Sequence, residues 1–127
     1  MQENQLFEYA VVRIVPRVER EEFLNVGVIL YCAKQKFLEA EFKVNEKRIR
    51  NFCAEINVEE VIEHLTTFEN ICKGKVQGGP IGRLPIAERF RWLTATRSTT
   101  LQTSKVHPGF TKDAEKTLQK LLKQLVS

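Results

Sequence analysis

The stretches LFEYAVVRIVPR at residues 6–17 and FLNVGVILYC at residues 23–32 decide the fold class that this sequence predicts. Both are rich in β-branched and aromatic residues, and each would carry apolar side chains on both faces of an extended chain. Such runs are typical of strands buried inside a sheet. Because proline cannot donate a ladder hydrogen bond, we expect Pro16 to end the first strand and the charged residues after it to form a connection.

The next apolar stretch alternates strictly. Residues 37–44, FLEAEFKV, place Leu38, Ala40 and Phe42 on one face and charged side chains on the other. This alternation is typical of a half-exposed antiparallel strand. We therefore expect three neighbouring antiparallel strands, at residues 9–15, 24–31 and 37–42.

The apolar period then changes to that of a helix. Asn45 is positioned to cap a short helix, and Asn57 with Glu60 forms the capping-box start of a longer one. His64 falls on the flank of the longer helix's apolar stripe, and we interpret it as a surface or packed histidine. The stripe consists of Val58, Val61, Ile62, Leu65, Phe68 and Cys72.

The clearest break in the chain is QGGPIGRLP at residues 77–85. Pro85 suits the first turn of a helix that runs to Leu93. Residues 94–104 are β-branched and polar, so we expect an edge strand there.

The whole pattern predicts one α+β domain that spans residues 1–127. A last helix begins after Thr111, which we expect to cap it, and runs to Leu125. Strands and helices that segregate in this way indicate a mostly antiparallel sheet of about four strands with helices packed on one side. A chain that is 43% hydrophobic and 28% charged is too apolar for a disordered protein and suits one compact domain.

The cysteines and the start of the chain point to the cytoplasm. Cys32, Cys53 and Cys72 lie in or beside apolar stretches, so we expect reduced, mostly buried thiols. No apolar run approaches the roughly 20 residues that span a bilayer, and residues 1–6 lack the features of a signal peptide.

The sequence calls for neither a metal nor a cofactor. It contains no Cys-x-x-Cys pair, two histidines, and Asp113 as its single aspartate, so zinc and calcium sites lack their usual ligands. The glycines of residues 77–85 are not followed by Gly-Lys-Ser/Thr, and no dinucleotide-binding fingerprint is present.

The basic excess is confined to residues 83–112. This segment has six basic residues and the acidic Glu88, hence a charge of +5, whereas the other 14 basic and 15 acidic residues give −1. Hydroxyl side chains accompany the cations, so phosphate is the expected ligand chemistry. The alternative is a solvated surface, or arginines that pair with glutamates of the first half. The six cations are Arg83, Arg89, Arg91, Arg97, Lys105 and Lys112.

Within this segment, residues 90–109 read FRWLTATRSTTLQTSKVHPG. Arg97 with Ser98 offers a forked cation and a hydroxyl, and we expect His107 on a tight turn before the last helix, whose N-terminus favours anions. We interpret Trp92 as a core anchor. The predicted ligand site is a cleft formed by Arg89, Arg91, Arg97, Ser98 and His107.

Three blocks together resemble the bacterial family called domain of unknown function 3037. They are YAVVRIVP at residues 9–16, EEFLNVGVILYC at residues 21–32, and the stretch at residues 90–109, with an aspartate and a leucine-rich end after it. The resemblance implies a small single-domain bacterial protein without an assigned activity. It also implies an accessory role beside a kinase-like partner that resembles the HipA toxin. The blocks include Arg13, Asn25, Gly27, Arg97, Ser98, His107, Pro108 and Gly109, and the family supplies no catalytic residues.

Three hypotheses on function follow. The first is an accessory or binding protein that engages a partner protein or a phosphate-bearing ligand through residues 83–112, and it requires no catalytic residues. The second is an enzyme acting on a phosphoester or nucleotide, with His107 as general acid or base and Arg97 stabilising charge. The third is nucleic-acid binding, which a pI near 9.1 favours but a net charge of +4 supports weakly. We favour the first and assign no catalytic residue.

Overall fold

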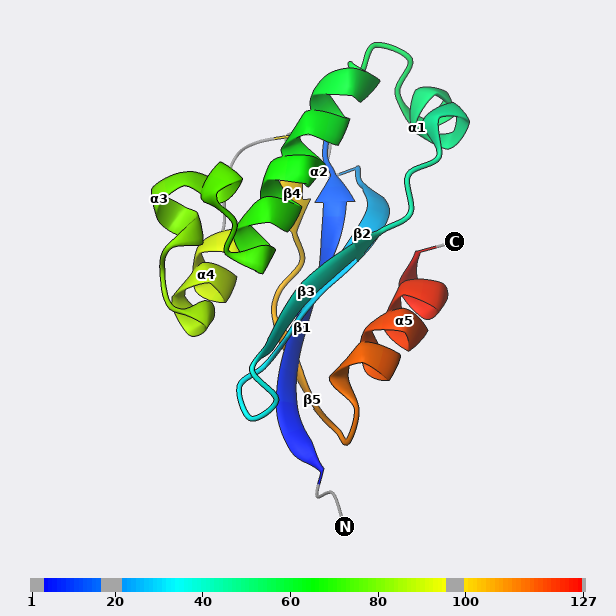
Figure 1. The fold of residues 1–127 in the computed structure, drawn as a ribbon. Coiled ribbons are helices and arrows are strands. Elements are labelled where there is room, and N and C mark those ends of the chain that lie inside the picture. The colour runs from blue at the N-terminus through cyan, green and yellow to red at the C-terminus, as the bar shows by residue number, and fades with distance from the viewer. Residues whose placement is uncertain (1–3, 17–21, 96–99, 127) are drawn as a thin grey trace.

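The computed structural model describes residues 4–16, 22–95 and 100–126 and has an α+β architecture (Figure 1). The strands are β1 (Gln5–Ile14), β2 (Leu24–Cys32), β3 (Phe37–Phe42), β4 (Leu101–Thr103) and β5 (His107–Thr111). The helices are α1 (Glu46–Phe52), α2 (Val58–Lys73), α3 (Gly79–Gly82), α4 (Ile86–Leu93) and α5 (Ala114–Leu125), with a 3₁₀ turn at Val76–Gly78.

The strands form one antiparallel sheet in the order β3-β2-β1, with β4 and β5 both paired to β1. The three neighbouring antiparallel strands predicted from the first third of the sequence are confirmed. β4 pairs with the end of β1 and β5 with its start, so these two short strands follow one another along β1. The sheet therefore has five strands in four positions.

Ser104 joins β4 to β5 without breaking the pairing with β1. Its backbone N–H donates to the carbonyl of Val11 at 2.8 Å, and its Oγ accepts from the N–H of Val11 at 2.8 Å. A side-chain hydroxyl thus satisfies a buried amide between the end of β4 and the start of β5. The sequence pattern missed β5, because His-Pro-Gly is typical of a turn and acquires its extended form here from pairing with β1.

A bulge in the β1–β2 pair changes which residues of β2 face which side. The register shifts between Val12 and Arg13, opposite Gly27. A Cβ on Gly27 would lie 2.6 Å from the carbonyl oxygen of Glu41, so β3 approaches too closely for a larger residue.

Helices cover both faces of the sheet. Apolar residues of α1, α2, α3 and α4 pack on the face that carries Val12 and Ile29, whereas α5 packs on Val28 and Leu30 of the opposite face (Figure 1). The α+β class and the antiparallel sheet are confirmed, but the expectation of helices on one side does not extend to α5. Because β2 is apolar on both faces, helices must pack on each face of the sheet to remove these side chains from water.

The predicted helix caps are borne out for two helices and corrected for a third. Asn45 Oδ1 accepts from the N–H of Arg48, and Asn57 Oδ1 accepts from the N–H of Glu60, each at 3.1 Å. The cap of α5 is Asp113, which accepts from the N–H of Lys116 at 3.1 Å, and not Thr111. The Thr111 hydroxyl instead accepts from the N–H of Asp113.

Most side chains expected in the core are buried, with Ile62 and Trp92 as exceptions. Trp92, interpreted from the sequence as a core anchor, is 36% exposed. Ile62 is 44% exposed because it lies on the flank of α2. Cys32 and Cys72 are buried and Cys53 is half-buried, all as free thiols. Burial raises the pKa of the Cys72 thiol to about 12, so this thiol stays protonated. None of the helices in the described ranges could span a bilayer.

Candidate functional site

Arg89 is one of the five predicted ligand-binding residues, but its side chain caps the C-terminal end of a helix. Its Nη1 donates to the carbonyls of Ile71 and Cys72 at 3.2 and 3.1 Å. These carbonyls belong to the last turn of α2, where a cation is favoured by the helix dipole. The chain leaves α2 through Gly74, which adopts the left-handed conformation (φ 67°). The guanidinium of Arg89 occupies the space that a Cβ at Gly74 would need. Arg89 therefore has a structural role.

His107 does not share a cleft with Arg89. It lies in β5 opposite Tyr9, and the two ring centroids are 5.3 Å apart. Tyr9 packs on the face of the sheet that α5 covers, whereas Arg89 contacts α2 on the other face. The predicted tight turn is a strand, and the sheet separates these two members of the predicted site.

The N-terminus of α5 is already occupied by protein groups. The Asp113 carboxylate accepts from the N–H of Lys116, and Gln35 Oε1 accepts from the N–H of Ala114 at 3.0 Å. The aspartate also places a negative charge where an anionic ligand would have to sit. Protein groups therefore satisfy two of the N–H groups on which the predicted anion site at this helix end depends. Arg97 and Ser98 lie outside the described residues.

Four other cations of the basic segment remain available to a ligand. Each is exposed, and none has a carboxylate partner among the residues that the structure describes. The expectation that arginines of this segment pair with glutamates of the first half is therefore wrong for both arginines in this set. We call the set the basic flank: Arg83, Arg91, Lys105 and Lys112.

The residues of the basic flank lie within or beside α4, β4 and β5. Arg83 precedes α4, Arg91 lies within α4, Lys105 lies between β4 and β5, and Lys112 directly follows β5. Buried aromatic packing of Phe90 on Tyr31, with ring centroids 5.2 Å apart, holds α4 on the sheet. Pairing with β1 holds β4 and β5.

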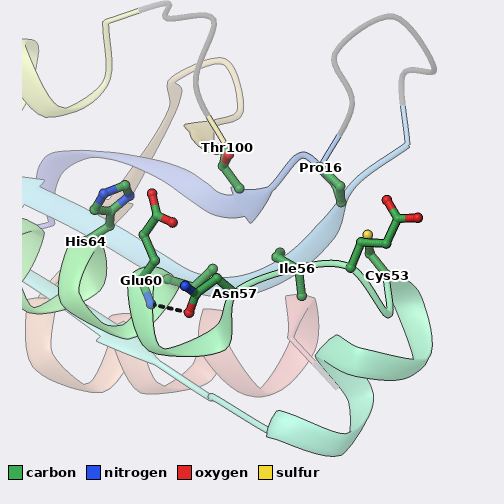
Figure 2. Close-up of a pocket in the computed structure, with 9 residues that line it drawn as sticks. Pro16, Cys53, Ile56, Asn57, Glu60, His64 and Thr100 are labelled. Carbon is green, nitrogen blue, oxygen red and sulfur yellow. Dashed lines mark hydrogen bonds between the residues drawn. The ribbon is translucent and has the colours of Figure 1, made fainter.

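Two cavities adjoin one another at His64. The first has a volume of about 300 Å³ and lies between the α1–α2 connection, the start of α2 and the edge of the sheet (Figure 2). The second, of about 230 Å³, lies between α2, α4 and β4. We call them the polar cavity and the apolar cavity. His64, which the sequence analysis interpreted as a surface or packed histidine, is exposed and forms a wall of both.

The polar cavity receives side chains from two successive turns of α2. Glu60 and His64 both project from the helix toward Thr100, which lies across the cavity (Figure 2). Asn57 is engaged in capping the helix. Across the described ranges, no three His, Cys, Asp or Glu side chains are grouped so as to hold a metal ion.

A family model described as protein of unknown function DUF3037 matches residues 9–126. The chain belongs to the DUF3037 family. No curated protein and no solved structure gives a significant match. The family resemblance seen in the sequence is therefore confirmed over nearly the whole chain.

The residues that carried this resemblance to DUF3037 have identifiable structural roles. Asn25 donates from Nδ2 to the carbonyl of Leu125 and so ties β2 to the end of α5. The guanidinium of Arg13 stacks 3.9 Å from the centroid of the Phe23 ring, and burial lowers its pKa. Gly109 lies directly against the ring of Phe7.

The two cavities of this DUF3037 protein were not predicted from the sequence. Glu60 and His64 are four residues apart on a helix that the sequence predicts, so the pattern indicates that their side chains lie on the same side of that helix. The pattern does not indicate their position opposite Thr100, because it depends on how α2 packs against the sheet.

Proposed function

We propose that this DUF3037 protein is a binding module that engages a partner protein or a phosphate-bearing ligand through the basic flank. The observation that carries the proposal is that all four cations of the flank are exposed without a carboxylate partner in the described part of the chain. Exposed cations without a carboxylate partner attract anionic groups. The family resemblance suggests a kinase-like protein as the partner.

The proposal rests on Arg83, Arg91, Lys105 and Lys112 and not on the cleft first expected. Arg89 is engaged by α2, and His107 by Tyr9. Arg91 offers a planar fork that can hold a phosphate or carboxylate through two hydrogen bonds, and the lysines act as point charges.

The test compares three probes by isothermal titration calorimetry: a phosphoserine peptide, its unphosphorylated form and a mixed-sequence oligonucleotide. We expect the phosphopeptide to bind, and the double variant Arg91→Ala/Lys105→Ala to bind it roughly tenfold more weakly. The matched control, Lys34→Ala/Lys47→Ala, removes two exposed lysines from the first half of the chain. It lowers the net charge equally and should change the affinity less than twofold.

Equal losses in the two double variants would refute the proposal, because they would indicate a response to net charge alone. Binding of the oligonucleotide alone, with a steep dependence on salt, would favour nucleic-acid binding instead.

A further inference from the structure

We propose that the two cavities beside His64 form a docking site for an extended peptide segment. The segment carries an aromatic residue, which enters the apolar cavity, and a lysine two positions away, which reaches Glu60 in the polar cavity. This site goes beyond the proposed function, because it takes a cationic peptide in the two cavities, whereas the basic flank takes an anionic group.

The apolar cavity has the size and walls that an aromatic side chain needs. Its volume of about 230 Å³ is several times the roughly 30 Å³ share of one water molecule. Phe68, Ile71 and Leu93 form its apolar walls together with the half-exposed Trp92. An apolar group that enters this space removes aromatic and aliphatic surface from water, which is the main source of affinity in such sites.

The polar cavity determines which charge the second side chain of the bound peptide can carry. The carboxylate of Glu60 projects into the cavity and makes no hydrogen bond or ion pair with a described residue (Figure 2). This charge favours an ammonium group and disfavours a phosphate or carboxylate.

The distance between Glu60 and Phe68 along α2 sets the spacing between the aromatic residue and the lysine of the bound peptide. Phe68 lies eight residues after Glu60, which is about 12 Å along the helix axis. Side chains two positions apart in an extended peptide lie on the same side, about 7 Å from one another, and a lysine side chain covers the remainder. His64 stands midway, at the shared wall that the peptide backbone would cross.

The test uses three capped tripeptides that differ in one residue: Phe-Gly-Lys, Phe-Gly-Gln and Phe-Gly-Glu. Trp92 is the single tryptophan of the chain and lines the apolar cavity, so its indole N–H signal in an NMR titration reports on this site. We expect saturable shifts with the lysine peptide and at least tenfold weaker binding of the glutamate peptide. Glu60→Gln should abolish the preference for lysine over glutamine, whereas Glu63→Gln, on the same helix but outside both cavities, should preserve it.

A second pair of variants tests the apolar cavity. Thr67 and Thr66 are both exposed on α2 and both donate to a backbone carbonyl four residues earlier, but only Thr67 lines the cavity. Thr67→Phe should therefore fill the cavity and abolish binding, while Thr66→Phe should leave it unchanged. The proposal is overturned if no peptide gives saturable shifts, if the glutamate peptide binds as tightly as the lysine peptide, or if both phenylalanine variants bind equally.

Discussion

At the scale of single residues, Arg89 shows how a side chain with the chemistry of a ligand site can be a structural element. Its guanidinium closes the end of α2 through two carbonyls, and its Nε is buried without a partner. Arg91, two positions later on α4, is exposed. The two arginines have similar sequence surroundings, and the packing of α4 against α2 assigns them opposite roles.

We predict that Arg89→Ala lowers the free energy of unfolding by about 1–3 kcal/mol, because two carbonyls at the end of α2 lose a charged donor. Arg91→Ala should change it by less than about 0.5 kcal/mol, as is usual for an exposed position. Urea denaturation of both variants measures the difference. Equal stability of the two variants would contradict the capping role.

At the scale of secondary-structure elements, the edge of the sheet depends on one hydroxyl group. Ser104 is 8% exposed, and its Oγ accepts from the N–H of Val11 in the central strand β1. Residues 104–106 separate β4 from β5, and both strands pair with β1. The chain thereby continues toward α5 without leaving a buried amide unpaired.

We predict that Ser104→Ala destabilises the protein by about 1–3 kcal/mol, since it leaves the N–H of Val11 without an acceptor. The amide of Val11 should also exchange faster with deuterated solvent. Thr66→Ala, which removes an exposed hydroxyl from α2, is the control and should alter neither measurement. Unchanged exchange at Val11 in the Ser104 variant would argue against the bridging hydroxyl.

At the scale of the whole molecule, α5 closes the second face of the sheet and brings negative charges together at the β3 edge. Glu39 of β3 has its pKa raised to about 6, first by burial and then by a hydrogen bond and charge repulsion from Glu115 of α5. The charge of Glu41 adds to this rise, and Lys73 of α2 opposes it. Ionisation of Glu39 therefore opposes the docking of α5 on this edge.

We predict that Glu39→Gln raises the Tm at pH 7 by about 1–3 °C. Because the folded-state pKa of about 6 lies above the ordinary value of 4.5, the stabilising contribution of Glu39 is full below pH 4.5 and is lost as the pH rises through 6. The variant and the parent should therefore have the same Tm near pH 4 and diverge above pH 5. Glu63→Gln serves as the control, and a parallel pH profile for Glu39→Gln would contradict the raised pKa.

Much of this fold follows from local patterns in the sequence. The three strands of the first third, the caps at Asn45 and Asn57 and the helix that begins after Pro85 depend on alternation, helical period and capping chemistry within a few residues. The basic excess of residues 83–112 is equally local. Such features are decided by each residue's nearest neighbours along the chain, so the sequence alone determined them.

Tertiary structure alone decided which of these residues meet. The sheet separates Arg89 from His107, pairing with β1 extends the Pro-Gly segment into β5, and the packing of α2 against the sheet edge places Thr100 opposite His64. Each outcome depends on contacts between residues far apart in sequence. These contacts stabilise the protein only once the helices have packed on the faces of the sheet. No pattern within a short window can carry that information, because the partners lie tens of residues away.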